Sequence, residues 1–391
     1  MATRKNNGDG SVFQVSDTKW VAKIQIGTKP DGKPDIKSFS AKTEALVKRK
    51  LKEYKRDKDK FLPTNISSIK FDDYIDNWLY NYKKHELKST SFDRLESTIN
   101  THIKPNIGSK QLPKITTEDI QSIVNDLFAQ KFSYSTIKKV HDALNAVFSY
   151  ALIKNDVAKN PMLLVSLPSK SKFETKQARI FSEDELAKIK CELNEYYSTG
   201  RYKYRYRDAF ILILNTGIRL GECLGIYKTD IDLAAQTLHI QRDVAVVRQR
   251  DGDDISEVTG YEAKVQNGTK TYSGDRIIDL NNQAMIAVNN LLALNPKGHL
   301  LIQQEDGGDI VNPTRFIKSF KSVLKNAGIE PCGVHSLRHT FASLLFNKGV
   351  SVKTVSEILG HASVKITYDT YIHLLQEQKR EAVQVLDDLT Y

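Results

Sequence analysis

The spacing of apolar residues changes along this 391-residue chain, and the change limits the folds that it can adopt. In Ser11–Val15, Lys19–Ile26 and Ile36–Ser40, apolar and polar residues alternate as they do in half-buried strands. From Phe71 onward, apolar residues recur three and four positions apart, which is the spacing of amphipathic helices. A single domain of one secondary-structure type cannot satisfy both patterns, so the sequence predicts a multidomain α+β protein.

Two segments without periodicity divide the chain into three predicted domains. Residues 56–64 are charged and residues 168–176 are basic, so both are interpreted as linkers. In the last part of the chain, residues 236–248 and 270–280 are predicted strands on either side of a polar loop at 249–268. The predicted domains are a small three-stranded sheet plus helix (1–62), an all-helical domain (68–165) and a mainly helical domain with a small β-sheet (178–391).

The charge of the chain is strongly positive and unevenly distributed. The sequence has 58 Lys+Arg against 47 Asp+Glu, a formal charge of +11. Residues 1–60 hold 16 Lys+Arg and 8 Asp+Glu, so +8 of this charge lies in the first sixth of the chain. Each Lys or Arg that contacts a phosphate releases a condensed counterion, so this excess favours a polyanionic partner such as nucleic acid.

The cysteines and the apolar runs exclude several other classes of protein. Cys191, Cys223 and Cys332 form neither a CxxC pair nor an even set, so neither a zinc site nor a disulfide framework is predicted. Phe210–Leu214 is typical of the apolar runs and is far shorter than the ~18 residues of a membrane span. Residues 1–7 lack the apolar stretch of a signal peptide. We therefore expect a cytoplasmic protein that binds no membrane, metal or cofactor.

Five short motifs in the third predicted domain each carry cationic or nucleophilic side chains. Taken alone, each has an ordinary structural explanation, such as a surface arginine after a helix cap or a lysine in a charged hairpin loop. Their order within one domain makes them a candidate site. They are Thr216–Glu222, Thr269–Leu280, His335–Thr340, Leu359–His361 and Thr367–His373.

The third motif places two histidines and an arginine near one face of a predicted helix. His335, Arg338 and His339 have the i, i+3 and i+4 spacing that brings side chains together. Two histidines four residues apart also occur in zinc proteases, but that pattern requires Glu after the first histidine, and Ser336 stands there. A metal site is therefore not predicted, and His339 is interpreted as a structural histidine.

Across residues 178–391, an ordered set of side chains resembles the six catalytic positions of the tyrosine recombinase (phage integrase) family. Residues 68–165 resemble the helical core-site-binding domain of that family. Residues 10–56 resemble the three-stranded arm-site-binding domain of integrases from phages and integrative conjugative transposons. The six positions are Arg219, Lys270, His335, Arg338, His361 and Tyr371.

The resemblance implies a site-specific DNA recombinase that needs neither metal nor ATP and that integrates and excises a mobile element. Tyr371 would attack the phosphorus and form a 3′-phosphotyrosine. Arg219 and Arg338 would clamp the non-bridging oxygens, because a guanidinium grips two phosphate oxygens at once. Lys270 would protonate the leaving 5′-hydroxyl.

The resemblance also implies roles for the other side chains of the set. His335 would assist proton transfer to and from the tyrosine, His361 would hydrogen-bond the phosphate, and Glu222 would orient an arginine. Tyr368 is a second candidate nucleophile. Tyr371 is preferred because it stands two residues before a histidine, as the nucleophile of the family does.

By the same resemblance, the expected partners are double-stranded DNA at core and arm sites and further copies of the chain in a homo-tetramer on DNA. An excisionase or a host DNA-bending protein would assist, and the expected location is the bacterial nucleoid. Residues 372–391 are predicted to form a helix that joins protomers. The predicted arm-site contacts are Lys19, Trp20, Lys23 and Lys37.

Three other functions remain open at this point. A type IB topoisomerase would share the chemistry. A chromosome-dimer resolving recombinase would resemble residues 68–391 but needs no N-terminal arm domain. A non-enzymatic DNA-binding protein would not need all six catalytic positions to be filled. Residues 1–62 and the complete catalytic set favour an integrase over each alternative.

Overall fold

The computed structural model of the chain comprises two compact units, Met1–Leu87 with Arg94–Phe173, and Lys88–Asp93 with Glu174–Tyr391. The residues that it describes are 11–16, 19–28, 34–58, 69–174, 178–250, 256–268, 274–304 and 310–372. The catalytic candidate Lys270 and the predicted tail helix after Ile372 lie outside these ranges.

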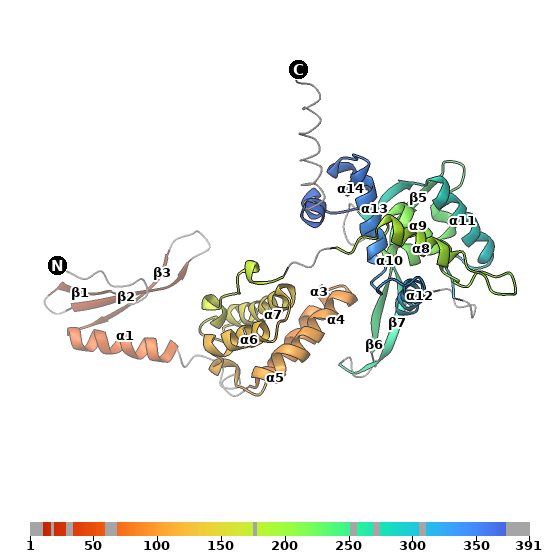
Figure 1. Cartoon of the computed structure of the whole chain (residues 1–391). Coiled ribbons are helices and arrows are strands. Elements are labelled where there is room, and N and C mark those ends of the chain that lie inside the picture. The colour runs from red at the N-terminus through yellow and green to blue at the C-terminus, as the bar shows by residue number, and fades with distance from the viewer. Residues whose placement is uncertain are drawn as a thin grey trace, which may run out of the picture. The chain divides into compact units, whose positions relative to one another are not determined.

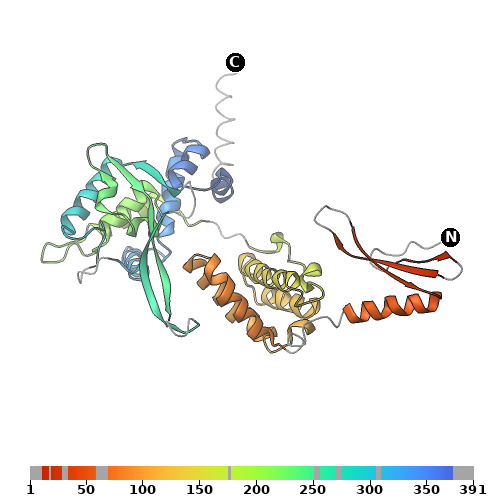
Figure 2. The same cartoon turned by 180° about the vertical axis from the view of Figure 1, so that it is seen from behind.

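The first unit begins with the predicted three-stranded sheet and its helix. Strands β1 (Ser11–Ser16), β2 (Lys19–Thr28) and β3 (Pro34–Ala41) pair antiparallel in that order. Helix α1 (Glu44–Lys58) lies along one face of the sheet (Figure 1 and Figure 2). Alternation explains this packing, because every second side chain of β2 points toward α1. The resulting small core contains Ala22, Ile24, Val47 and Leu51.

The rest of the first unit is helical, as predicted. Its helices include α2 (Phe71–Trp78), α6 (Thr117–Ala129) and α7 (Tyr134–Ile153). The predicted apolar faces are buried, and the rings of Phe71 and Phe148 stack with centroids 5.4 Å apart. The other α-helices are α3 (Lys84–Glu86), α4 (Ser89–Thr98) and α5 (Lys104–Ile107), with α4 shared between the units.

The second unit combines helices with a small sheet, which confirms the predicted fold class. The apolar helix α9 (Arg207–Thr216) lies in its core, where Phe210 contacts Phe316 and Phe320 of α12 (Pro313–Asn326). The sheet has the order β4-β5-β8, with β4 (Ile231–Asp232), β5 (Thr237–Ile240) and β8 (Arg276–Asp279). The other helices are α8 (Glu183–Leu193), α10 (Leu220–Leu224), α11 (Asn282–Leu294), α13 (His335–Asn347) and α14 (Val352–Leu359).

The segment predicted as a polar loop at 249–268 is largely a strand. β6 (Arg242–Arg250) pairs antiparallel with β7 (Val258–Asn267), and together they form a long ribbon within the second unit (Figure 1). Ala263 and Val265 of β7 pack on the core of the unit. The polar residues suggested a loop because much of the ribbon is open to solvent, where a strand can carry Thr, Glu, Lys and Gln.

Candidate active site

Arg219 is positioned by a sharp turn between α9 and α10. The helix α9 ends at Gly217, whose φ of 67° is left-handed and where an added Cβ would lie 2.3 Å from the Phe341 ring. The chain then reverses, and Arg219 begins α10. Its Nη1 donates to Glu222 Oε1 at 2.6 Å, and its Nη2 donates to the carbonyl of Gly360 at 3.0 Å. Both terminal nitrogens of this arginine are therefore held, one by Glu222 on α10 and the other by the backbone that follows α14.

Arg338 is fixed by two backbone carbonyls, one in the turn after α9 and one at the end of α14. It lies on α13, is 1% exposed, and donates to the carbonyls of Gly217 at 2.7 Å and Leu359 at 2.8 Å. Burial, followed by the nearby Arg219, lowers the pKa of Arg338 to about 9, so the group stays charged at neutral pH. Arg219 and Arg338, which are distant in sequence, are thus both held by backbone carbonyls at the end of α14.

Glu222 connects Arg219 to a third arginine that sequence reasoning did not select. Its buried carboxylate accepts a hydrogen bond from Arg276 Nη2 at 2.9 Å. Burial opposes ionisation, but Arg276 and then Arg219 lower the pKa of Glu222 to about 2. Arg276 also donates to the carbonyl of Ile358 at 2.7 Å. The sequence signal was the position of Arg276 on β8, two residues before the buried Ile278. Side chains two residues apart on a strand point to the same face, so this arginine points inward as well.

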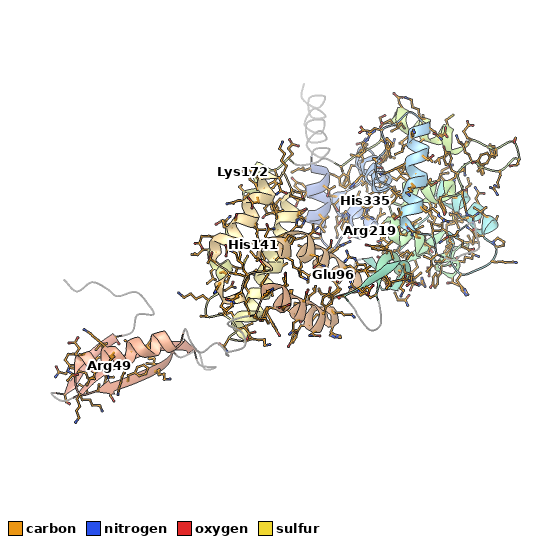
Figure 3. All side chains as sticks on the ribbon, turned by 90° about the horizontal axis from the view of Figure 1, so that it is seen from below. Arg49, Glu96, His141, Lys172, Arg219 and His335 are labelled. Carbon is orange, nitrogen blue, oxygen red and sulfur yellow. The ribbon has the colours of Figure 1, made fainter. Side chains whose placement is uncertain are left out.

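Two of the predicted histidines lie beside these arginines. His335 is the first residue of α13 and His361 follows α14, and Figure 3 labels Arg219 and His335 in the same unit. His335 remains open to solvent on one side, and the loss of hydration on its packed side, followed by His339 and Arg338, lowers its pKa to about 4. Burial, then Arg338 and Arg219, lower the pKa of His361 to about 3. Both rings are therefore neutral at pH 7 before a phosphate binds.

Tyr371 is buried next to this cluster, in the helical segment 364–372. Its side chain is 1% exposed, and its ring lies 5.4 Å from that of Phe346, measured between centroids. Burial raises the pKa of the Tyr371 hydroxyl to about 12, although Arg338 opposes the rise. Tyr368, the second candidate, is 39% exposed.

His339, which the sequence suggested was structural, contacts the candidate nucleophile. Its Nδ1 lies 2.7 Å from the Tyr371 hydroxyl oxygen. Its ring meets that of His335 edge to face, with centroids 4.7 Å apart. The i, i+4 spacing of the two histidines was the signal in the sequence. That spacing could not show which histidine faces the tyrosine, because the segment carrying Tyr371 packs on α13 only in the folded unit.

The four predicted arm-site residues lie on both faces of the N-terminal sheet. Alternation along β2 directs Lys19 and Lys23 to the face opposite α1, and Lys23 Nζ lies 5.5 Å from the centroid of Phe13 there. Trp20 packs against the small core on the α1 face. Lys37 pairs in register with the buried Ile24, so its side chain belongs to the α1 face too. Phe13, which the sequence reasoning did not select, is an aromatic residue of the face opposite α1 and is 39% exposed.

Two further observations concern membranes and metals. None of the helices in the described ranges combines the length and the apolar character that crossing a bilayer requires. Among those same residues, no group of three or more His, Cys, Asp or Glu side chains is arranged as metal ligands would be.

Two relatives match nearly the whole chain. A tyrosine recombinase XerC-like protein of Caldanaerobacter subterraneus subsp. tengcongensis is 29% identical over 383 residues, which cover 94% of this chain and 95% of that protein. An integrase of Streptomyces ambofaciens is 25% identical and aligns over 100% of this chain and 98% of its own length. The matches therefore include the N-terminal sheet as well as the helical parts.

Solved structures share the fold. The Tn1549 transposon integrase in complex with transposon right end DNA has a TM-score of 0.62 at 19% identity, covering 82% of this chain and 100% of that one. A lambda integrase tetramer bound to a Holliday junction has a TM-score of 0.57 at 16% identity, covering 94% and 96%.

Two family models match separate parts of the chain. The model of the phage integrase N-terminal SAM-like domain matches residues 70–128, which are mainly helical. The phage integrase family model matches residues 180–378, which include the three arginines, both histidines and Tyr371. The chain belongs to the phage integrase family of site-specific tyrosine recombinases.

Proposed function

We propose that the chain is an integrase that cuts and rejoins DNA through a 3′-phosphotyrosine at Tyr371 in order to integrate and excise a mobile element. One observation carries the proposal, which is the gathering of Arg219, Arg338, His335 and His361 beside a buried tyrosine hydroxyl. These are the groups that metal-free transfer of a phosphoryl group to a protein oxygen requires. Lys270 remains the proposed proton donor to the leaving 5′-oxygen.

The charge of the site matches the charge that develops during strand cleavage. Three guanidinium groups and the carboxylate of Glu222 leave a net charge of +2, because the two histidines are neutral. A phosphodiester carries one negative charge and gains about one more when an oxyanion attacks it. The site can therefore stabilise the transition state without a divalent ion. Cleavage is expected to continue in EDTA, and strict dependence on added Mg²⁺ would contradict this mechanism.

The geometry suggests how the arginines would act. Each terminal nitrogen of Arg219 and Arg338 carries a second N–H beyond the hydrogen bond described above. The first N–H fixes the guanidinium plane, and the second can bind a non-bridging phosphate oxygen. We propose that this arrangement orients the phosphorus before attack. His361, whose Nδ1 lies 2.7 Å from Thr367 Oγ1, would contact the phosphate with its other nitrogen.

The partners follow from the same proposal. Double-stranded core-site DNA would bind the helical domain and the catalytic unit, and arm-site DNA would bind the open face of the N-terminal sheet, through Lys19, Lys23 and Phe13. Four copies would act together, as in the lambda integrase tetramer bound to a Holliday junction. An excisionase or a host DNA-bending protein would set the direction of the reaction. Because the proposed substrate is DNA, the protein would act at the bacterial nucleoid.

The alternative functions are not favoured. The Streptomyces ambofaciens integrase and the XerC-like protein align with nearly the whole chain, whereas the Listeria monocytogenes tyrosine recombinase XerC aligns with 68% of it. The integrase is favoured because a chromosome-dimer resolving recombinase does not need the N-terminal domain and because the Tn1549 and lambda integrases share the fold. A topoisomerase would relax plasmid DNA lacking any recombination site, which we expect this protein not to do.

The test of the proposal is the identity of the covalently linked residue. Core-site DNA can be taken from the junctions formed when the gene is expressed beside its flanking DNA. With a nicked suicide substrate of that sequence, the wild-type protein should form a covalent adduct that peptide mapping assigns to Tyr371. Tyr371→Phe should bind the same DNA and form no adduct, while Tyr368→Phe should form it normally. An adduct on Tyr368, or one formed by Tyr371→Phe, would overturn the assignment.

A further inference from the structure

The hydroxyl of Tyr371 has a defined hydrogen-bond partner. His339 Nδ1 lies 2.7 Å from the hydroxyl oxygen. Tyr371 is held by packing, because it is 1% exposed and its ring also meets Phe346. A nucleophile and a base within hydrogen-bond reach form the arrangement that activates hydroxyl nucleophiles in other enzymes. The contact joins α13 to the helical segment 364–372, so the fold itself brings the two groups together.

The protonation states of the pair decide the direction of this hydrogen bond. Burial, and then Arg338 on the same helix, lower the pKa of His339, which is therefore neutral at neutral pH. Tyr371 keeps its proton, because its pKa is raised to about 12. The arrangement consistent with both is a phenol that donates to an unprotonated Nδ1, with the proton of the imidazole on Nε2.

We propose that His339 is the base of the cleavage step. Its Nδ1 accepts the phenolic proton while the Tyr371 oxygen forms a bond to phosphorus and the bond from phosphorus to the 5′-oxygen breaks. The leaving 5′-oxygen takes a proton from a separate acid, for which Lys270 is the candidate. On rejoining, the 5′-hydroxyl attacks, the bond between tyrosine and phosphorus breaks, and His339 returns the proton. This role rests on the proposed function of Tyr371.

His335 is less well placed for the same task. The structure pairs the phenol with His339, whereas the His335 ring meets the His339 ring edge to face and lies near Arg219 and Arg338. The charged and titratable groups that meet His339 are Arg338 and His335 from α13 and Tyr371 from the segment 364–372. A proton received by His339 thus lies next to Arg338. The negative charge that the phosphate gains in the same step offsets this repulsion.

The experiment measures single-turnover cleavage of the suicide substrate by the full-length protein. General-base catalysis contributes roughly 10²–10⁴-fold, so His339→Ala and His339→Gln should cleave at least about 10²-fold more slowly. Binding of the same DNA and the thermal unfolding midpoint serve as controls for folding. His239→Ala is the matched control, because His239 is an exposed histidine paired with Asp275 on the same unit. It should cleave normally.

Three readouts separate a base from a merely structural residue. Added imidazole should restore part of the cleavage rate of His339→Ala and leave that of His239→Ala unchanged. In the wild type the rate should fall at acidic pH as His339 becomes protonated, and this acidic limb should be absent in His339→Gln. A 5′-phosphorothiolate substrate, whose leaving group needs no acid, should restore Lys270→Ala but not His339→Gln.

Each contrary outcome is informative. Normal or faster cleavage by His339→Ala would show that the hydrogen bond only holds the tyrosine at rest, and restoration of His339→Gln by the phosphorothiolate would make His339 the acid. Either result overturns the inference. Failure of the wild type to form an adduct on Tyr371 would instead remove the proposed function, so the two failures are distinguishable.

Discussion

The two ends of the chain both present cations, but they hold them in different ways. In the second unit, Arg338 is buried and Arg276 is partly buried, and backbone carbonyls and Glu222 hold their guanidinium groups. On the N-terminal sheet, Lys19 and Lys23 are exposed on the face opposite α1. Fixed guanidinium groups suit a reaction, because the phosphate must be held in one geometry. Exposed lysines suit binding, because a flexible point charge can follow a DNA backbone without fixing it.

The largest effect is expected from replacing a clamp arginine by lysine. Arg219→Lys keeps the charge but cannot contact both Glu222 and the Gly360 carbonyl as the guanidinium does. Cleavage of the suicide substrate should fall by about 10²-fold or more, with a much smaller change in DNA affinity. Arg179→Lys, at an exposed arginine paired with Glu185, is the control and should cleave normally. Near-normal cleavage by Arg219→Lys would show that this arginine does not touch the phosphate.

A second effect concerns stability and its dependence on pH. The folded-state pKa of Glu222 is lowered to about 2 from an ordinary 4.5, so its ionised form stabilises the fold. That stabilisation is complete above pH 4.5 and is lost as the pH falls toward 2, and it amounts to about 3 kcal/mol. Glu222→Gln mimics the protonated acid and should be less stable by about this amount at pH 7.

Urea unfolding of both proteins at several pH values measures this difference. The gap in unfolding free energy between wild type and Glu222→Gln should narrow below pH 4.5, because the wild-type carboxylate then becomes protonated as well. Glu262→Gln, at an exposed carboxylate beside Lys264, is the control and should change stability little at any pH. A gap that stayed constant down to pH 3 would mean that Glu222 does not neutralise the two arginines.

From the sequence, the individual residues of the candidate site could be selected more easily than the hydrogen bonds between them. The resemblance to the family selected Arg219, Arg338 and Tyr371, each of which lies in a short motif on a helix or turn. Arg276 and His339 were not selected, since their hydrogen bonds are to partners distant in sequence, Glu222 and Tyr371. Local spacing carries no information about such partners.

The same limit applies to the fold. Alternation predicted all three N-terminal strands, because the α1 face of that sheet is buried and the pattern is therefore regular. β7 was predicted as loop, because much of the ribbon is exposed and its polar residues obscure the alternation. Trp20 was selected as a DNA contact for its residue type, and only the register of the sheet shows that it faces α1.

The smallest effect should come from the sheet, and it tests whether its two faces differ. Lys23 and Lys37 lie on neighbouring strands, but Lys23 is on the open face and Lys37 on the α1 face. If DNA docks on the open face, Lys23→Ala removes one phosphate contact, so binding to arm-site DNA should weaken modestly. The slope of log affinity against log salt should then decrease by about 1. Lys37→Ala should leave both quantities nearly unchanged. Lys23→Arg should retain binding, because a phosphate contact on this face needs the positive charge and does not need the two-pronged geometry of a guanidinium.

Filter binding with the full-length protein at several salt concentrations measures all three variants. An equal loss in Lys23→Ala and Lys37→Ala would mean that charge acts from both faces, and the contrast with the fixed arginines of the catalytic unit would then be one of degree.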